Sequence, residues 1–132
     1  MPGKIQITNF NHVVTMVKDT PRAMKFYHDL LGIKQIQSQV DNPKITWLQL
    51  PDGTMLHLIE TPDAPAKPEN IHHAFQVKDF EGTRKILQEN GYPAVSEGVR
   101  HDGQCYIFVR DPEGNRVEIC TAAGYAPAPP RR

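Results

Sequence analysis

The sequence has no excess charge of either sign and no long apolar segment. Its 132 residues include 15 lysines and arginines and 15 aspartates and glutamates, so the formal net charge is +0. Proteins that hold nucleic acid or an anionic membrane by charge carry a basic patch, and a membrane helix needs about 20 consecutive apolar residues. We therefore expect no nucleic-acid partner and no membrane association. The length suits one domain over residues 1–132.

Cysteine is also scarce. Only Cys105 and Cys120 are present, and they do not form a C-x-x-C motif. We therefore expect two structural thiols rather than a disulfide or a metal–thiolate site. The N-terminal stretch MPGKIQITNF lacks the apolar segment of a secretory signal. Together these features predict a soluble protein in a reducing, cytoplasmic compartment.

An internal repeat, in which each copy starts with a histidine, is the main positive feature of the sequence. Residues 12–19 are HVVTMVKD, and residues 72–79 are HHAFQVKD. A nearly constant offset also relates glycines later in the two halves. Three pairs of landmarks have spacings of 60, 59 and 61 residues: His12 and His72, Gly32 and Gly91, and Gly53 and Gly114. Such steady spacing indicates a duplicated structural unit.

Each half has the pattern of one strand, one helix and three further strands. In the first half, Asp19 or Thr20 can cap a helix, Pro21 suits its first turn, and Gly32 suits its end. An equivalent helix is predicted within 79–91. Apolar stripes at helical spacing support both helices: Ala23, Phe26, Tyr27 and Leu30, then Phe80, Thr83, Ile86 and Leu87. The later strands are predicted at 33–39, 45–50, 54–59, 94–99, 105–110 and 115–120.

These elements predict an α+β fold of two β-α-β-β-β modules. A single four-stranded unit leaves one sheet face uncovered, so the two units should pack or pair to bury it. The predicted boundaries are module one at 5–60, a Pro-rich linker at 61–70, module two at 71–121 and a frayed tail at 122–132.

The repeat also predicts a cluster of polar side chains. His57 and Glu118 each lie four residues beyond a turn glycine, in the last strand of their module. Because side chains alternate faces along a strand, His12, His57, His72 and Glu118 can point into one hollow. A lone strand histidine is more often hydrogen-bonded than a metal ligand, but this register favours a ligand set. Imidazoles and a carboxylate suit Zn, Fe, Mn, Ni or Co.

Three stretches resemble the vicinal oxygen chelate superfamily, which includes glyoxalase I, bleomycin-resistance proteins and extradiol dioxygenases. They are NHVVTMVKDTPRAMKFYHDLLGI at 11–33, IHHAFQVKD at 71–79 and FVRDPEGNRVEI at 108–119. The resemblance implies two β-α-β-β-β modules whose curved mixed sheets surround a shared cavity. It also implies a divalent metal in that cavity, with ligands at His12, His57, His72 and Glu118. Glyoxalase I has a glutamate at the position of His57, so the resemblance leaves His57 open as either a fourth ligand or a catalytic base.

The function implied is a metal-dependent enzyme that binds a small substrate through two adjacent oxygens, with glyoxalase-like lyase or isomerase chemistry. The alternatives are an Fe(II) extradiol-type dioxygenase held by His12, His72 and Glu118, and a thiol transferase of the fosfomycin-resistance type. A metal-free binding protein of the bleomycin-resistance type is the alternative from another class. The resemblance also implies a homodimer, with the site built within one chain or across two.

Overall fold

The computed structural model describes residue 6, residues 8–64 and residues 71–123, and it divides the chain into two compact units. The units comprise Met1–Ala66 and Lys67–Arg132, and their positions relative to one another are not determined. They contain the two predicted modules, and we call them module one and module two. Most of the predicted tail and part of the predicted linker lie outside the described residues.

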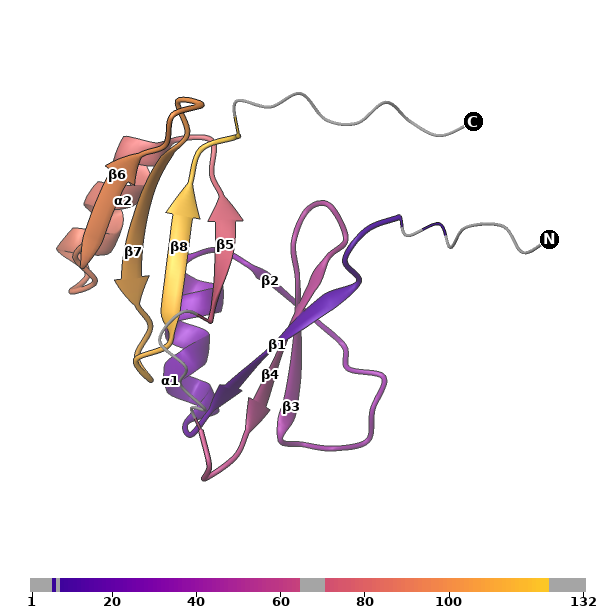
Figure 1. Ribbon diagram of the computed structural model, residues 1–132. Helices are drawn as coiled ribbons and strands as arrows, with labels where there is room; N and C mark the ends of the chain where they lie inside the picture. Colours follow the sequence, from indigo (N-terminus) through magenta and orange to yellow (C-terminus); the bar gives the residue numbers. More distant parts are fainter. Residues whose placement is uncertain (1–5, 7, 65–70, 124–132) are drawn as a thin grey trace. The chain divides into compact units, whose positions relative to one another are not determined.

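Module one contains one mixed four-stranded sheet with the order β1-β4-β3-β2 (Figure 1). Strand β1 runs parallel to β4, and the other two pairings are antiparallel. The elements are β1 (His12–Val17), α1 (Thr20–Met24), the π-helix η1 (Lys25–Leu30), β2 (Lys34–Ile36), β3 (Ile45–Gln49) and β4 (Met55–Glu60).

Module two has the same topology, in the order β5-β8-β7-β6 (Figure 1). Strand β5 runs parallel to β8, and the remaining pairs are antiparallel. The elements are β5 (His72–Gln76), α2 (Phe80–Glu89), β6 (Ser96–Val99), β7 (Cys105–Arg110) and β8 (Arg116–Cys120). The predicted α+β fold and its duplication are therefore confirmed.

Both helices begin as the sequence predicts. The Asp19 carboxylate accepts a hydrogen bond from the Arg22 backbone N–H at 3.1 Å, and Pro21 occupies the first turn. The Asp79 carboxylate accepts from the Gly82 N–H at 3.0 Å. A Cβ at Gly82 would lie 2.1 Å from Asp79 Oδ2, so the missing side chain leaves room for this cap.

The end of the first helix differs from the prediction of one regular α-helix. After Met24 the backbone continues as the π-helix η1, with the Leu31 N–H bonded to the Phe26 carbonyl at 2.9 Å. A π-turn contains more residues than an α-turn, so it shifts later side chains around the helix axis. Phe26 and Tyr27 are fully buried as expected, whereas Leu30 is only half-buried.

The core of each module lies on one face of its sheet. In β4, Leu56 and Leu58 on either side of His57 are buried. In β8, Val117 and Ile119 on either side of Glu118 are buried in the same way. The prediction for Ile86 was wrong, because this side chain is 50% exposed at the edge of the α2 stripe. Among the described residues, no helix combines the length and apolar character needed to cross a membrane.

Candidate metal centre

The strand pairing places the predicted site residues at equivalent positions in the two modules. In module one, His57 pairs with Val14, two residues after His12. In module two, Glu118 pairs with Ala74, two residues after His72. The repeat register predicted from the glycine spacing is therefore the register of the sheets. Each module therefore has one histidine at the start of its first strand. Each also has one polar side chain on its last strand, opposite the residue two positions after that histidine.

His12 and His57 lie together in module one. Their ring centroids are 4.3 Å apart and the rings are nearly parallel, at 16°. The other face of His57 stacks on Trp47, with centroids 4.3 Å apart and an angle of 6°. Trp47 is the residue of β3 paired with His57. The imidazole of His57 is thus held between two rings, and only 8% of the residue is exposed.

The contacts of the two imidazoles leave one nitrogen of each ring for a metal. His12 Nδ1 lies 2.7 Å from the Asn11 side-chain oxygen, so Nδ1 donates to Asn11 and Nε2 is the atom left for a metal. Burial lowers the pKa of His57, and the nearby His12 lowers it further, so the neutral ring is favoured. His57 Nε2 is buried and has no hydrogen-bond partner in the described part of the chain.

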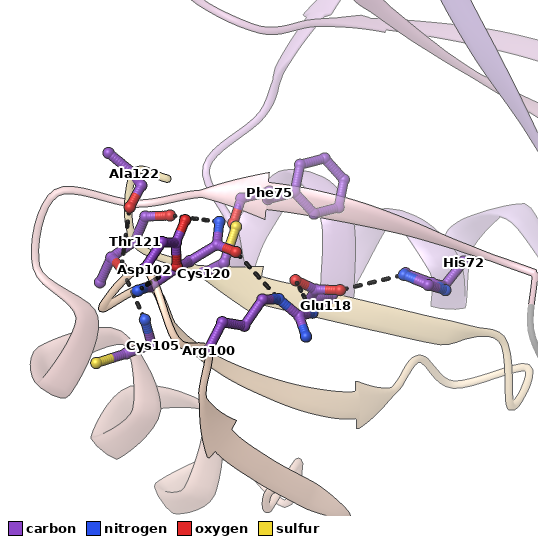
Figure 2. Close-up of polar contacts among 10 residues, drawn as sticks. His72, Phe75, Arg100, Asp102, Cys105, Glu118, Cys120, Thr121 and Ala122 are labelled. Carbon is purple, nitrogen blue, oxygen red and sulfur yellow. Dashed lines mark hydrogen bonds and ion pairs between the residues drawn. The ribbon is translucent and has the colours of Figure 1, made fainter. Parts of the chain in front are cut away.

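His72 and Glu118 lie together in module two. His72 Nε2 is 3.1 Å from Glu118 Oε1, and the Glu118 residue is only 5% exposed. Glu118 Oε2 accepts from Arg100 Nη2 at 3.4 Å, so the carboxylate lies between an imidazole and a guanidinium, as Figure 2 shows. The His72 ring also meets Phe108, the β7 residue paired with Glu118, edge-on at 5.0 Å.

Arg100 was missed by the sequence reasoning. It follows β6, in a loop beyond the residues that the repeat was used to align. Its guanidinium stacks over Tyr106 at 4.1 Å from the ring centroid. A cation close to Glu118 follows in principle from the burial of that carboxylate, because a buried charge is costly without a partner.

The other candidate side chains lie elsewhere. Glu60 was expected on the opposite face from His57, and its carboxylate accepts from the Thr20 N–H at 3.2 Å. His28, expected at the surface, donates from Nδ1 to the Ile33 carbonyl at 2.8 Å. Cys105 and Cys120 are free thiols, as predicted.

The residues present fit a divalent ion. Two ligand atoms that bind one metal at right angles, each with a bond of about 2.1 Å, lie about 3.0 Å apart. His72 Nε2 and Glu118 Oε1 are in direct hydrogen-bonded contact at 3.1 Å, so the two atoms are close enough to bind one ion in place of each other. The unpartnered Nε2 of His57 is a further donor. No set of three His, Cys, Asp or Glu side chains with metal-binding geometry occurs among the described residues. Each described pair therefore offers at most two such side chains.

Comparisons with known proteins agree with this architecture. Residues 9–119 match the family model of the Glyoxalase/Bleomycin resistance protein/Dioxygenase superfamily. The chain is 29% identical over 126 residues to Glyoxylase I 4 of Arabidopsis thaliana, covering 88% of this chain and 72% of that protein. It is 30% identical over 122 residues to the metallothiol transferase FosB of Staphylococcus saprophyticus, covering 87% and 78%.

A solved structure shows the same fold. The lactoylglutathione lyase of Agrobacterium tumefaciens superposes with a TM-score of 0.72 at 18% identity, covering 88% of this chain and 95% of that one. The duplicated modules, their shared register and the match over residues 9–119 lead to one conclusion. The chain belongs to the Glyoxalase/Bleomycin resistance protein/Dioxygenase superfamily.

Proposed function

We propose that this protein is a divalent-metal-dependent enzyme that acts on a small substrate through two adjacent oxygens, with glyoxalase-like isomerase or lyase chemistry. The observation that carries the proposal is that each module has, at equivalent positions of its first and last strands, two side chains of types that can bind a metal. The relatives named as a glyoxylase and a metallothiol transferase support this class of chemistry.

The proposed ligands are His12 and His57 from module one and His72 and Glu118 from module two. One negative and up to three neutral ligands suit Zn, Ni, Mn, Co or Fe(II). The ion would supply Lewis-acid polarisation of a substrate oxygen. The protein would supply the orientation, because the ring stack fixes His57 and the contacts with His72 and Arg100 fix Glu118.

His57 has the chemistry for either of two roles. Its lowered pKa keeps a lone pair available at neutral pH, which serves a fourth ligand and a proton acceptor equally. As proton acceptor, Nε2 would take a proton from a substrate carbon next to a carbonyl and return it to the neighbouring atom. The metal content of a His57 variant distinguishes the roles, because only a ligand should change it.

The second candidate function is an Fe(II) dioxygenase of the extradiol type. The proposed ligands other than His57 favour this candidate. His12, His72 and Glu118 have the two-histidine, one-carboxylate composition of non-haem iron sites. A metal-free binding protein is disfavoured by the same donors. Purified protein that retains no divalent ion after reconstitution and desalting would support that third alternative.

The test is elemental analysis followed by activity after reconstitution with Zn, Ni, Mn, Co and Fe(II). A glyoxalase-like enzyme should consume the hemithioacetal of methylglyoxal and glutathione with at least one of these ions and without oxygen. An extradiol-type enzyme should consume oxygen with catechols and only with Fe(II). Loss of neither substrate with any ion would contradict both candidate reactions.

We also propose that the protein is a homodimer, and mixing of variants tests how the site is assembled. His12→Ala inactivates the contribution of module one, and Glu118→Gln inactivates that of module two. If each site joins modules of two chains, subunit exchange should restore about a quarter of the wild-type sites, because half the dimers are mixed and each has one intact site. If the site joins modules of one chain, the mixture should stay inactive.

A further inference from the structure

The Glu118 carboxylate already has a cation of the protein's own beside it. Arg100 Nη2 donates to Glu118 Oε2 at 3.4 Å (Figure 2). Arg100 Nε donates to the Gln104 side-chain oxygen at 3.1 Å. The Nη1 atom has no partner among the described residues, and the side chain is 43% exposed. Arg100 therefore neutralises a buried carboxylate while keeping donor capacity.

A local feature of the sheet supports the guanidinium. Arg100 lies over the Tyr106 ring at 4.1 Å from its centroid. Tyr106 is paired with Gly98 across β6 and β7, and a Cβ at Gly98 would come within 2.6 Å of the Tyr106 hydroxyl oxygen. The absence of a side chain at Gly98 is therefore what lets Tyr106 take this position. Tyr106 thus lies over Gly98, Arg100 lies over the Tyr106 ring, and Arg100 donates to Glu118.

The same residues line a pocket. It has a volume of about 550 Å³ and is lined by Val99, Arg100, His101 and Tyr106. The nearby Asp102 carboxylate accepts from the Gln104 N–H at 2.9 Å, within its own turn. The pocket thus presents a guanidinium, an imidazole and a phenol ring. The planar N–H donors of the Arg100 guanidinium can bind both oxygens of one carboxylate group.

We propose that Arg100 has two alternating partners: the Glu118 carboxylate, and a carboxylate group of the substrate held in this pocket. The inference rests on the proposed function, because it needs a divalent ion bound to Glu118. Such an ion would place positive charge beside the guanidinium. The ion on Oε1 and Arg100 on Oε2 would then share the single negative charge of Glu118, and the excess positive charge weakens the hold of Glu118 on Arg100 and favours an anion there. Ion and anion should therefore bind with positive coupling.

The test is calorimetric titration with Co²⁺ and with benzoate, a monocarboxylate whose ring suits the Tyr106 wall. In the wild-type protein, saturating Co²⁺ should tighten benzoate binding about fivefold or more. Arg100→Gln removes the competing cation, so Co²⁺ should bind about fivefold more tightly, and the coupling with benzoate should fall below about twofold. Arg100→Lys should keep Co²⁺ affinity near wild type but lose most of the coupling, because lysine keeps the charge without the fork.

Arg84→Gln is the matched control. Arg84 also stacks on a ring, Phe80, and pairs with the exposed Glu97, so this variant removes the same charge away from Glu118. It should leave both affinities within about twofold of wild type. Weaker or unchanged Co²⁺ binding in Arg100→Gln, or intact coupling in it, would overturn the inference while leaving the proposed function standing. No Co²⁺ binding by the wild-type protein would overturn the proposed function and the inference together.

Discussion

The two modules carry chemically different side chains at one equivalent position of their last strands. His57 in module one and Glu118 in module two occupy the same place in the strand register. His57 is enclosed by the rings of His12 and Trp47, whereas Glu118 is enclosed by the charged or chargeable groups of Arg100 and His72.

The difference follows from what each buried group requires. A neutral imidazole can be buried against flat rings at small cost, and its lowered pKa shows that the neutral form is favoured. A buried carboxylate needs hydrogen-bond donors or opposite charge. The duplicated backbone fixes where each group lies, and the neighbouring side chains decide its charge. Module one thus holds a buried imidazole for which the neutral form is favoured, and module two holds a buried carboxylate beside two groups that can donate to it.

Removing the carboxylate of module two should have the largest effect. Glu118→Gln should weaken divalent-ion affinity by about 100-fold or more, because the one anionic ligand is lost. Glu60→Gln is the matched control, since Glu60 faces the start of α1 and should leave ion affinity within about twofold. Calorimetry with Co²⁺ measures both. Equal losses in the two variants would mean that position 118 has no special role.

Replacing the imidazole of module one should have a smaller effect. His57→Phe keeps the ring between His12 and Trp47 but removes Nε2. As a neutral ligand, His57 should contribute about tenfold to ion affinity. The fluorescence of Trp47, the only tryptophan, should then respond less to Co²⁺. Unchanged affinity with reduced turnover would assign His57 to proton transfer, and unchanged values of both would remove it from the site.

Acid should destabilise module one through His57. Its folded-state pKa is lowered, so the unfolded chain binds more protons as the pH falls below the ordinary value of about 6.5. The stability that depends on neutral His57 should therefore be fully present above about pH 6.5. The free energy of unfolding should then decrease as the pH falls from this value through the lowered pKa. His57→Phe should lose less stability than wild type between pH 7.5 and pH 5, measured by urea unfolding with a chelator present. An equal loss in both proteins would contradict the shifted titration.

The smallest expected effect is on thiol reactivity in module two. Burial raises the pKa of Cys120, and the neighbouring Glu118 charge raises it further. A thiol reagent should therefore modify the half-buried Cys105 before Cys120. Glu118→Gln should speed labelling of Cys120 and leave Cys105 unchanged, as followed by mass spectrometry. Faster labelling of Cys120 than of Cys105 in the wild-type protein would contradict the account of this strand.

Sequence patterns predicted the fold because its determinants are local or repeated. Asp19 and Asp79 cap their helices through their own side chains. The nearly constant spacing of the repeat predicted that His57 and Glu118 occupy equivalent positions in the strand register. The π-helix at Lys25–Leu30 was not predicted, because apolar spacing at i, i+3, i+4 and i+7 does not distinguish it from an α-helix.

The candidate site was predicted only in part. Strand alternation and the repeat predicted that His12, His57, His72 and Glu118 point into one hollow. Within the modules, the structure places His12 beside His57 and His72 beside Glu118. Arg100 escaped because it lies in a loop outside the repeat, and loop side chains are positioned by tertiary contacts such as its stack on Tyr106. That the two pairs share one ion remains a prediction.

The most direct measurement is the number of Co²⁺ ions bound per chain in the wild-type protein, His12→Ala and Glu118→Gln, determined by elemental analysis after desalting. The account predicts one ion per chain in the wild type and a large loss in both variants, although the substitutions lie in different modules. Full Co²⁺ content in either variant, or two ions per wild-type chain with one lost in each variant, would contradict a single centre shared by the two modules.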